Sequence, residues 1–320
     1  MTSVALCTYN GGKYIEEQIS SILNQSVPVD EIVVCDDGST DNTLTLIEKF
    51  QCQTITNIHI YRNEHQLGVC ANFQKAINLC KGDIIFLSDQ DDVWHRDKVE
   101  VICKWFDKHP TKNVVFTNAN LIDDKGRIFQ NDSLWNRVGF SRKECFWFNI
   151  GLGIEVFMRG NVSTGAKMAV RKINANFLSY TKDQVLFHDE VIAEIALIKN
   201  ELGLISSRLI DYRLHDHQVC GMPYSPIIRI SAVKPSWNTS RLAELPFYEK
   251  VKERCDFGQT RLVSKHSWFG MYALLNLRTY LHIYGVRCGV FVIGNDIIDS
   301  YNHSITRIVN RFKRSLGYCS

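Results

Sequence analysis

The chain has 320 residues, of which 45% are hydrophobic and 22% are charged, a balance typical of a globular protein with one large core or two small ones. The net charge of +3 gives the whole chain no basic excess, so we expect no nucleic-acid partner, and no uncharged apolar run is long enough to span a bilayer. The 11 cysteines form no CxxC pair, and their odd number without a signal peptide indicates a reducing, cytoplasmic location.

Strand-like and helix-like segments alternate over the first 120 residues. The pattern predicts strands at 4–8, 31–35, 58–61, 83–87 and 113–117, and helices at 13–25, 41–50, 69–80 and 97–108. Such alternation indicates a parallel sheet with helices on both faces. The pattern then weakens, with a helix expected at 185–197 and a short strand at 209–212. Four of the six prolines lie between Pro223 and Pro246 and mark a loop-rich connection.

The strand expected at 83–87 runs directly into three carboxylates, those of Asp89, Asp91 and Asp92. Aspartate is unfavourable inside a strand, so the three residues belong in the loop at its carboxyl end, where open parallel sheets bind ligands. Their mutual repulsion raises the free energy of the loop unless a cation relieves it. Hard oxygen ligands suit Mg²⁺ or Mn²⁺ beside a phosphate-bearing substrate. A solvated acidic turn that caps the next helix is the alternative.

Two further polar loops follow strands of the same sheet. The first strand ends in Thr8-Tyr9-Asn10-Gly11-Gly12 and the second in Asp36-Asp37-Gly38-Ser39. Because the carboxyl ends of parallel strands meet at one edge, we expect these loops to converge with the acidic loop. The alternative for Asp36 and Asp37 is that they belong to a turn that only caps the following helix.

These motifs resemble those of the family 2 glycosyltransferases. The resemblance rests on residues 4–11, 33–41, 63–68 with Asn72, and 87–94 in the nucleotide-sugar half, then on Thr164-Gly165-Ala166, His188-Asp189-Glu190, and Tyr212-Arg213-Leu214-His215 with Gln218 and Gly221. The last segment resembles bacterial O-antigen, capsule and rhamnan transferases. The resemblance implies a GT-A (Rossmann-like) α/β fold, with a mostly parallel sheet, helices on both faces and a helical C-terminal extension.

The resemblance also implies a division of the chain. Residues 1–221 would form the catalytic domain, with a nucleotide-sugar-binding half at 1–118 and an acceptor and catalytic half at 119–221. Residues 222–320 would form a loop-rich linker and a helical, basic and aromatic region.

Site roles follow from the same resemblance. It implies a metal site at Asp91 and Asp89 for Mn²⁺ or Mg²⁺, and a sugar and acceptor pocket at Asp92, Trp94, Thr164 and Gly165, although core packing is the alternative for Trp94. It implies donor binding by Thr8, Tyr9, Asn10, Asp36, Asp37, Asn72, Asp89, Arg213 and His215. Asp189 is the expected general base because it opens a helix whose dipole favours its charged form, and Glu190 is the alternative.

The expected function is an inverting, metal-dependent transfer of a sugar from a UDP-hexose or dTDP-rhamnose. The acceptor would be a polyprenyl-diphosphate-linked or other glycan in bacterial surface polysaccharide synthesis. A catalytically silent nucleotide-sugar-binding module is one alternative. A sugar-phosphate nucleotidyltransferase is another, although Gly11-Gly12-Lys13 is a poor substitute for its glycine-rich phosphate loop.

The last 60 residues suggest contact with an anionic membrane surface. No acidic residue lies between Gly258 and Asn295, where basic residues interrupt an aromatic-rich run, and four more basic residues follow between Arg307 and Arg314. Cations beside exposed aromatics suit anionic headgroups. We therefore expect docking on the inner face of the cytoplasmic membrane, with packing of these helices onto the catalytic domain as the alternative.

Overall fold

The structure is a computed structural model that describes residues 1–130, 132–149, 162–172, 187–216 and 218. All of them belong to the first of the two units into which the chain divides, Met1–Asp256 and Phe257–Ser320. The predicted boundary at residue 221 and the predicted membrane-docking segment lie outside the described residues. No helix among the residues searched is long and apolar enough to cross a membrane.

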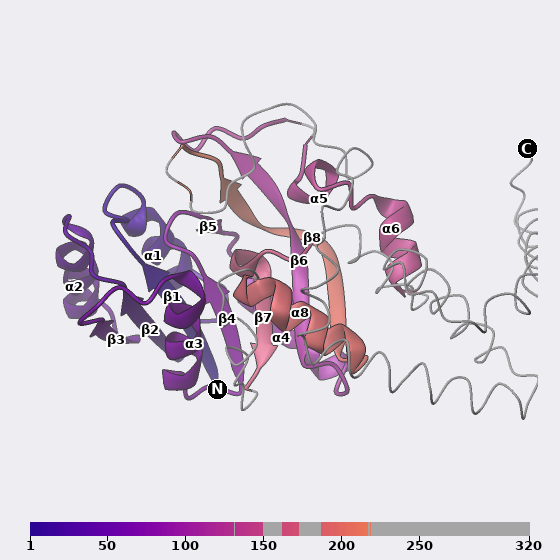
Figure 1. Ribbon diagram of the computed structural model, residues 1–320, viewed down its shortest axis with the longest axis horizontal. Helices are drawn as coiled ribbons and strands as arrows, with labels where there is room; N and C mark the ends of the chain where they lie inside the picture. The colour runs from indigo at the N-terminus through magenta and orange to yellow at the C-terminus, as the bar shows by residue number, and fades with distance from the viewer. Residues whose placement is uncertain (131, 150–161, 173–186, 217, 219–320) are drawn as a thin grey trace, which may run out of the picture. The chain divides into compact units, whose positions relative to one another are not determined.

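Eight strands form one sheet in the order β3-β2-β1-β4-β7-β6-β8-β5 (Figure 1). The strands are β1 (Thr2–Thr8), β2 (Glu31–Asp36), β3 (Asn57–Arg62), β4 (Ile84–Ser88), β5 (Val93–Trp94), β6 (Val114–Ile122), β7 (Met168–Arg171) and β8 (Leu202–Arg213). The pairs β1–β2, β2–β3, β1–β4 and β6–β8 are parallel, whereas β7 is antiparallel to β4 and β6, and β5 is antiparallel to β8. The expected mostly parallel sheet is confirmed.

The described helices are α1 (Ile15–Leu23), α2 (Thr43–Gln53), α3 (Val69–Leu79), α4 (Lys98–Lys108), α5 (Leu134–Arg137), α6 (Arg142–Trp147) and α8 (His188–Ile198), with a 3-10 turn η2 (Gly165–Lys167). Every helix expected before residue 120 is present, within a few residues of its predicted ends. The sequence pattern missed β5, β7, α5 and α6, because these elements are too short to show a period. It also predicted only the last third of β8.

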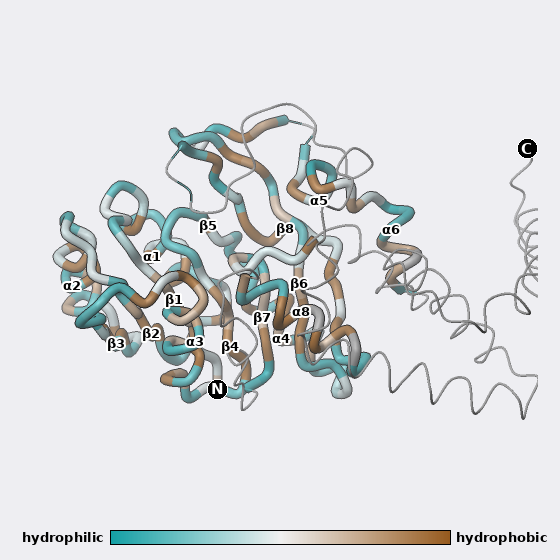
Figure 2. The backbone as a smooth tube through the Cα atoms, in the orientation of Figure 1, coloured by the Kyte–Doolittle hydropathy of each residue, from teal (hydrophilic) through white to brown (hydrophobic). Residues whose placement is uncertain are grey.

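Side chains of the strands alternate between two apolar clusters, one on each face of the sheet. In β1, Val4 and Leu6 join one cluster, while Ala5 and Cys7 join the other. The first cluster contains buried residues of α1, α2 and α4, and the second contains buried residues of α3, α5 and α8. Figure 2 shows hydrophobic stretches along β4 and β7, and hydrophilic residues gathered in loops. Period-two alternation therefore places helices on both faces, as predicted.

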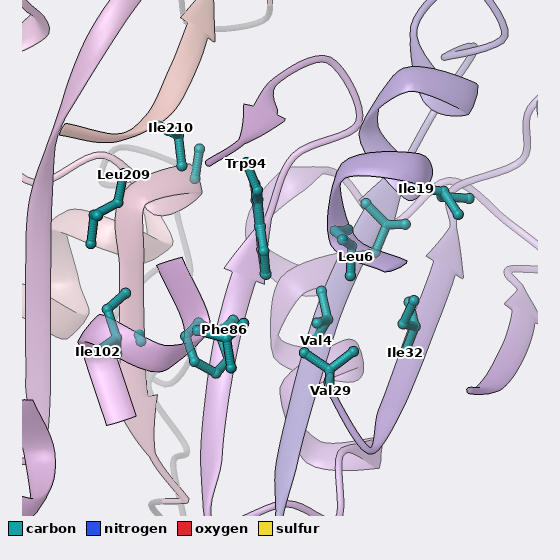
Figure 3. Close-up of a cluster of buried hydrophobic side chains, with 14 of the residues drawn as sticks. Val4, Leu6, Ile19, Val29, Ile32, Phe86, Trp94, Ile102, Leu209 and Ile210 are labelled. Carbon is teal, nitrogen blue, oxygen red and sulfur yellow. The ribbon is translucent and has the colours of Figure 1, made fainter. Parts of the chain in front are cut away.

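The first cluster extends across the sheet beneath the polar loops. Figure 3 shows Leu6 and Phe86 from the central strands together with Trp94, Ile102 and Ile210. Trp94 is only 3% exposed and its ring lies 5.7 Å from that of Phe86. The structure thus shows Trp94 packed in the core, and its assignment to a sugar pocket stays a prediction.

Candidate active site

The loops after β1 and β4 are joined through Gln90, a residue to which the sequence analysis gave no role. The Tyr9 backbone N–H donates to Gln90 Oε1 at 2.8 Å, and Gln90 Nε2 donates to the Tyr9 carbonyl at 3.0 Å. The Asn10 N–H donates to the Ser39 hydroxyl at 2.9 Å, which ties the loop after β1 to the loop after β2. The three polar loops therefore meet at one edge of the sheet, as expected from the strand order.

Asp36 organises the loop after β2 and is fully buried. Its Oδ2 accepts from the Thr8 hydroxyl at 2.8 Å and from the Ser39 hydroxyl at 2.5 Å, and its Oδ1 accepts from the N–H groups of Gly38 at 3.1 Å and Ser39 at 2.8 Å. The assignment of Thr8 and Asp36 to donor binding stays a prediction. Both side chains are buried and bonded to the protein, because the turn needs an acceptor for its donors.

We expect Asp36→Ala to lower the free energy of unfolding by about 2–4 kcal/mol, because four donors lose an acceptor and each hydrogen bond contributes about 1 kcal/mol. Urea unfolding followed by circular dichroism measures the change. Asp124→Ala is the control, since the Asp124 side chain is 46% exposed and pairs with Lys13 only at 3.7 Å. Equal losses in the two variants would contradict the structural role of Asp36.

Asp37 holds the loop between β3 and α3. Its Oδ1 accepts from Asn63 Nδ2 and from the Leu67 N–H, both at 2.7 Å, and its Oδ2 accepts from the Gly68 N–H at 2.9 Å. Asn72 is 2% exposed, donates to the Cys35 carbonyl at 2.8 Å and accepts from Asn63 at 2.9 Å. Asn72 therefore supports the loop, and its assignment to donor binding stays a prediction.

A cavity of about 460 Å³ opens beside this loop. It is lined by Tyr9 from the loop after β1, by Asp37 and Gly38 from the loop after β2, and by Arg62 with residues 63–66 after β3. Tyr9 is 43% exposed, whereas the Asn10 side chain accepts from the Thr40 N–H at 2.9 Å. Tyr9 and Asp37 are thus the predicted donor-binding residues that line a cavity.

The acidic loop brings Asp91 against His215. Asp91 Oδ2 and His215 Nε2 are 2.8 Å apart, although the two residues are 124 positions apart in the sequence. Both side chains are largely shielded, at 14% and 8% exposed. The predicted metal residue and a predicted donor-binding residue therefore form one pair.

Burial and mutual repulsion disfavour the charged forms of the other two carboxylates. Burial and the neighbouring charge of Asp91 raise the pKa of Asp89 to about 8. Burial and the charge of Asp91 also raise the pKa of Asp92 well above its usual value. Asp92 Oδ1 accepts from the Arg213 N–H at 3.0 Å, and its Oδ2 has no hydrogen-bond partner in the described part of the chain.

Arg213 is buried and its guanidinium is bonded within the protein. Nε donates to the Asp91 carbonyl at 2.8 Å, one terminal nitrogen donates to the Asp123 carbonyl at 3.2 Å, and the other pairs with Glu17 Oε2 at 2.5 Å. The guanidinium also lies 4.8 Å from the centre of the Tyr14 ring. In this structure Arg213 joins α1, the acidic loop and the end of β8, and its assignment to the donor stays a prediction.

Asp189 lies in the first turn of α8 and is 7% exposed. Its Oδ2 accepts from the Gly165 N–H at 3.0 Å, and its Oδ1 accepts from the Glu190 N–H at 2.8 Å. Its charge reaches the acidic loop, since it helps to raise the pKa of Asp89. Burial and the Asp189 charge raise the pKa of Glu190 to about 7. The structure thus brings Asp189 within electrostatic reach of the acidic loop.

His188 fixes the turn that contacts Asp189. Its ring stacks on Phe73 with 3.9 Å between centroids, and neither ring nitrogen has a hydrogen-bond partner among the described residues. Burial lowers the pKa of this imidazole. A Cβ on Gly165 would lie 2.6 Å from His188 Nε2, so only glycine fits there. Thr164 precedes the turn and is half-buried.

We expect Gly165→Ala to destabilise the protein by about 1–3 kcal/mol, because the new methyl group cannot fit beside a ring held by stacking. A double-mutant cycle with His188→Ala tests this cause by thermal unfolding. The cost of Gly165→Ala should shrink when the His188 ring is absent. Additive effects of the two substitutions would mean that the ring does not impose the glycine.

The sequence analysis assigned no role to two lysines that are buried in the structure. Lys98 Nζ donates to the Ala166 carbonyl and Lys167 Nζ to the Val162 carbonyl, both at 2.9 Å. Burial lowers the pKa of each ammonium to about 7. The helical spacing of Lys98, Ile102 and Phe106 was the signal that could have revealed the first, because it puts the lysine on the apolar face of α4.

Among the described residues that were searched, no three His, Cys, Asp or Glu side chains converge closely enough to hold a metal ion by themselves. Asp91 and His215 offer a carboxylate and an imidazole, and the charge of Asp91 acts on Asp89. Mg²⁺ is commonly bound by one or two carboxylates together with substrate phosphates. The donor set therefore fits a divalent cation that substrate phosphates complete.

Several known proteins are similar to this chain in sequence. Residues 3–161 match the family described as "Glycosyl transferase family 2". The dTDP-rhamnosyl transferase RfbG of Shigella flexneri is 39% identical over 119 residues, which are 36% of this chain and 38% of that protein. Chondroitin synthase of Escherichia coli is 32% identical over 135 residues, 42% of this chain and 19% of that protein. The chain thus matches well under half the length of these relatives.

Two further similarities span more of the chain. An uncharacterized glycosyltransferase of Haemophilus influenzae is 26% identical over 226 residues, 68% of this chain and 67% of that protein. The crystal structure of S. aureus TarS 1-349 in complex with UDP-GlcNAc is 17% identical, covers 88% of this chain and 72% of that chain, and has a TM-score of 0.51. The structural similarity shows the fold, so the expected GT-A, Rossmann-like architecture is confirmed.

Proposed function

Because the chain belongs to family 2 of the glycosyl transferases, we propose that it is an inverting, metal-dependent enzyme that moves a sugar from a nucleotide-sugar to a glycan acceptor. The observation that supports the proposal most directly is the contact of Asp91 with His215 at one sheet edge, where Asp89 lies within the electrostatic reach of Asp91 and Asp189. Cavity-lining residues Tyr9 and Asp37 lie on adjoining loops of the same edge.

In this proposal the Asp189 carboxylate takes the proton of the acceptor hydroxyl, and the hydroxyl oxygen attacks the anomeric carbon. The bond from that carbon to the diphosphate oxygen breaks, and the nucleoside diphosphate leaves with the electron pair. Attack from the face opposite the leaving group inverts the configuration. General-base assistance of this kind contributes roughly 10²–10⁴-fold in rate.

Asp91, with Asp89 and His215, would hold Mn²⁺ or Mg²⁺. When bound, such a cation supplies positive charge that stabilises the leaving diphosphate. The protein's own task is to keep these side chains in place. The Gln90 amide fixes the acidic loop against the Tyr9 backbone, and Arg213 fixes it against α1 and β8.

We propose a UDP-hexose or dTDP-rhamnose as the donor. RfbG is named as a dTDP-rhamnosyl transferase, and TarS was solved with UDP-GlcNAc. The acceptor would be a polyprenyl-diphosphate-linked or other glycan of a bacterial surface polysaccharide, which would bring the protein to the inner face of the cytoplasmic membrane.

A panel of UDP-hexoses and dTDP-rhamnose tests the proposal. Release of UDP or dTDP is measured with the purified protein and glycan acceptors, with Mn²⁺, with Mg²⁺ and with EDTA. We expect one donor to be turned over only when a divalent cation is present. Nucleotide-sugar binding without turnover by any donor and acceptor would favour the silent binding module. Turnover that is unchanged by EDTA would contradict the metal dependence of the reaction.

A further inference from the structure

One aromatic ring, that of Tyr14, contacts two residues of the segment that carries His215. Tyr14 directly precedes α1 and is 8% exposed. Its ring centre lies 4.9 Å from that of the His215 imidazole, with 38° between the ring planes, and 4.8 Å from the guanidinium of Arg213. The start of α1 therefore meets the end of β8 through this ring as well as through the ion pair of Glu17 with Arg213.

The backbone around Tyr14 fixes the place of the ring. The Gly11 carbonyl accepts from the N–H groups of Tyr14 and Ile15, both at 3.0 Å, and the Gly11 N–H donates to the Thr43 hydroxyl at 2.8 Å. Gly11 belongs to the loop after β1, which also carries Tyr9 of the cavity. The ring is thus anchored on the loop that lines the cavity, whereas the imidazole that it contacts comes from the other end of the described chain.

The Tyr14 ring adds a constraint on the His215 imidazole that a hydrogen bond does not supply. His215 Nε2 lies 2.8 Å from Asp91 Oδ2, and the His215 backbone N–H donates to Gln218 Oε1 at 3.3 Å. A hydrogen bond at one ring nitrogen sets a distance but lets the imidazole plane turn about it. A second ring packed against the imidazole restricts that rotation. The orientation of His215 toward Asp91 therefore depends on Tyr14 as well.

The contacts identify the aromatic ring as the part of Tyr14 that matters. The face of an aromatic ring attracts cations, and Lys13 Nζ and the Arg213 guanidinium each lie 4.8 Å from its centre. An aliphatic side chain would fill the space but has no such face. Arg213 Nε in turn donates to the Asp91 carbonyl at 2.8 Å. The ring thus contacts both of the side chains that reach Asp91 from the end of β8.

We propose that Tyr14 is a positioning residue of the transferase, whose ring supports Arg213 and His215 and so fixes the His215 imidazole against Asp91. Tyr14 acts through these two side chains. This inference rests on the proposed function, because it assigns Tyr14 to the pair of Asp91 and His215 in that reaction. It requires the ring of Tyr14 and not its hydroxyl group.

Three substitutions separate the ring from the hydroxyl group. Tyr14→Phe keeps the ring, whereas Tyr14→Leu and Tyr14→Met remove it, so that one folded non-aromatic protein is sufficient. Affinities for UDP and dTDP are measured by calorimetry in EDTA and in Mn²⁺, and the ratio of the two values is the Mn²⁺-dependent gain. We expect the non-aromatic variants to lose about 10-fold of this gain, because partners that orient a ligand side chain are worth about 10–100-fold in metal affinity. Affinity in EDTA should stay at the wild-type value, since the cavity is intact.

Turnover gives a second measurement on the same proteins. We expect kcat to fall about 10-fold or more in Tyr14→Leu and Tyr14→Met, because the imidazole no longer keeps one orientation. Tyr14→Phe should restore both kcat and the Mn²⁺-dependent gain to within about 2-fold of the wild type, since the ring is still present. A Tyr14→Phe protein as defective as Tyr14→Leu would contradict the assignment to the ring.

The chain offers a matched control in Trp105. Its ring stacks on His109 with 4.2 Å between centroids and packs against the first apolar cluster. Trp105→Leu therefore also removes an aromatic ring from a histidine, but from one that has no part in the proposed site. We expect this variant to have a lower melting temperature, with the kcat and the Mn²⁺-dependent gain of the wild type.

A double-mutant cycle with His215→Gln tests whether Tyr14 acts through His215. Once the imidazole is absent, Tyr14→Leu or Tyr14→Met should cause little further loss of the Mn²⁺-dependent gain. The effects of the two substitutions on the melting temperature in EDTA should likewise be non-additive. A full loss in both backgrounds, or a wild-type gain in a folded non-aromatic variant, would overturn the inference and leave the proposed function intact. A wild type without any Mn²⁺-dependent gain would overturn the metal part of the proposed function and this inference with it, and that result is read from the wild type alone.

Discussion

Asp91→Ala is expected to reduce sugar transfer by roughly 10²-fold or more while the protein stays folded. Asp91 is the acidic-loop residue whose carboxylate meets an imidazole, at 2.8 Å from His215 Nε2, and its charge raises the pKa of both Asp89 and Asp92. Removing it deletes a ligand of the proposed cation and relieves like-charge repulsion. We therefore expect the rate of sugar transfer to fall while the melting temperature rises or stays the same.

The measurement compares initial rates over a Mn²⁺ titration with the melting temperature in EDTA. Asp97→Ala is the matched control, because Asp97 is an exposed acid a few residues further on whose side chain makes no capping hydrogen bond. We expect the control to transfer sugar at the wild-type rate. An Asp91→Ala protein with full activity would show that the Asp91–His215 pair is not part of the reaction.

Asp189→Asn is expected to lower kcat by roughly 10²–10⁴-fold with little change in donor affinity. The amide has nearly the shape of the carboxylate and its oxygen can still accept from the Gly165 N–H. It cannot take a proton from an acceptor hydroxyl. Single-turnover rates and nucleotide-sugar binding by calorimetry separate the two effects. A loss of donor affinity as large as the loss of turnover would contradict the assignment of the base.

Glu190→Gln distinguishes the alternative base. The pKa of Glu190 is raised to about 7, so this carboxyl is protonated below that pH and ionised above it. If Glu190 were the base, kcat would fall as the pH drops through about 7, and Glu190→Gln would abolish that dependence. We expect Glu190→Gln to retain most of the turnover. A kinetic defect found only in Glu190→Gln would transfer the role to this residue.

The convergence of the polar loops was predictable because it depends on local pattern and on a topological rule. Strands that alternate with helices form parallel sheets, and the carboxyl ends of parallel strands share an edge. The loops that begin at Thr8, Asp36 and Asp89 accordingly meet. The individual roles were less predictable, since Thr8, Asp36, Asn72 and Arg213 look like ligand-binding side chains by type. Their burial and hydrogen bonds in the structure are what assign them to holding the loops.

By itself, the sequence determined the α/β class, the order of the early elements and the existence of an acidic loop after β4, because these follow from side-chain periodicity and from residues adjacent in the chain. Only the tertiary structure decided which distant residues meet. The contact of Asp91 with His215, the tie of Lys98 to Ala166 and the closeness of Gly165 to His188 each join residues more than 20 positions apart. Such pairs leave no periodic signal, since they depend on how strands far apart in the chain are paired in the sheet. The insertion of β7, antiparallel, between β4 and β6 is the clearest case: it brings the turn before β7 to the start of α4.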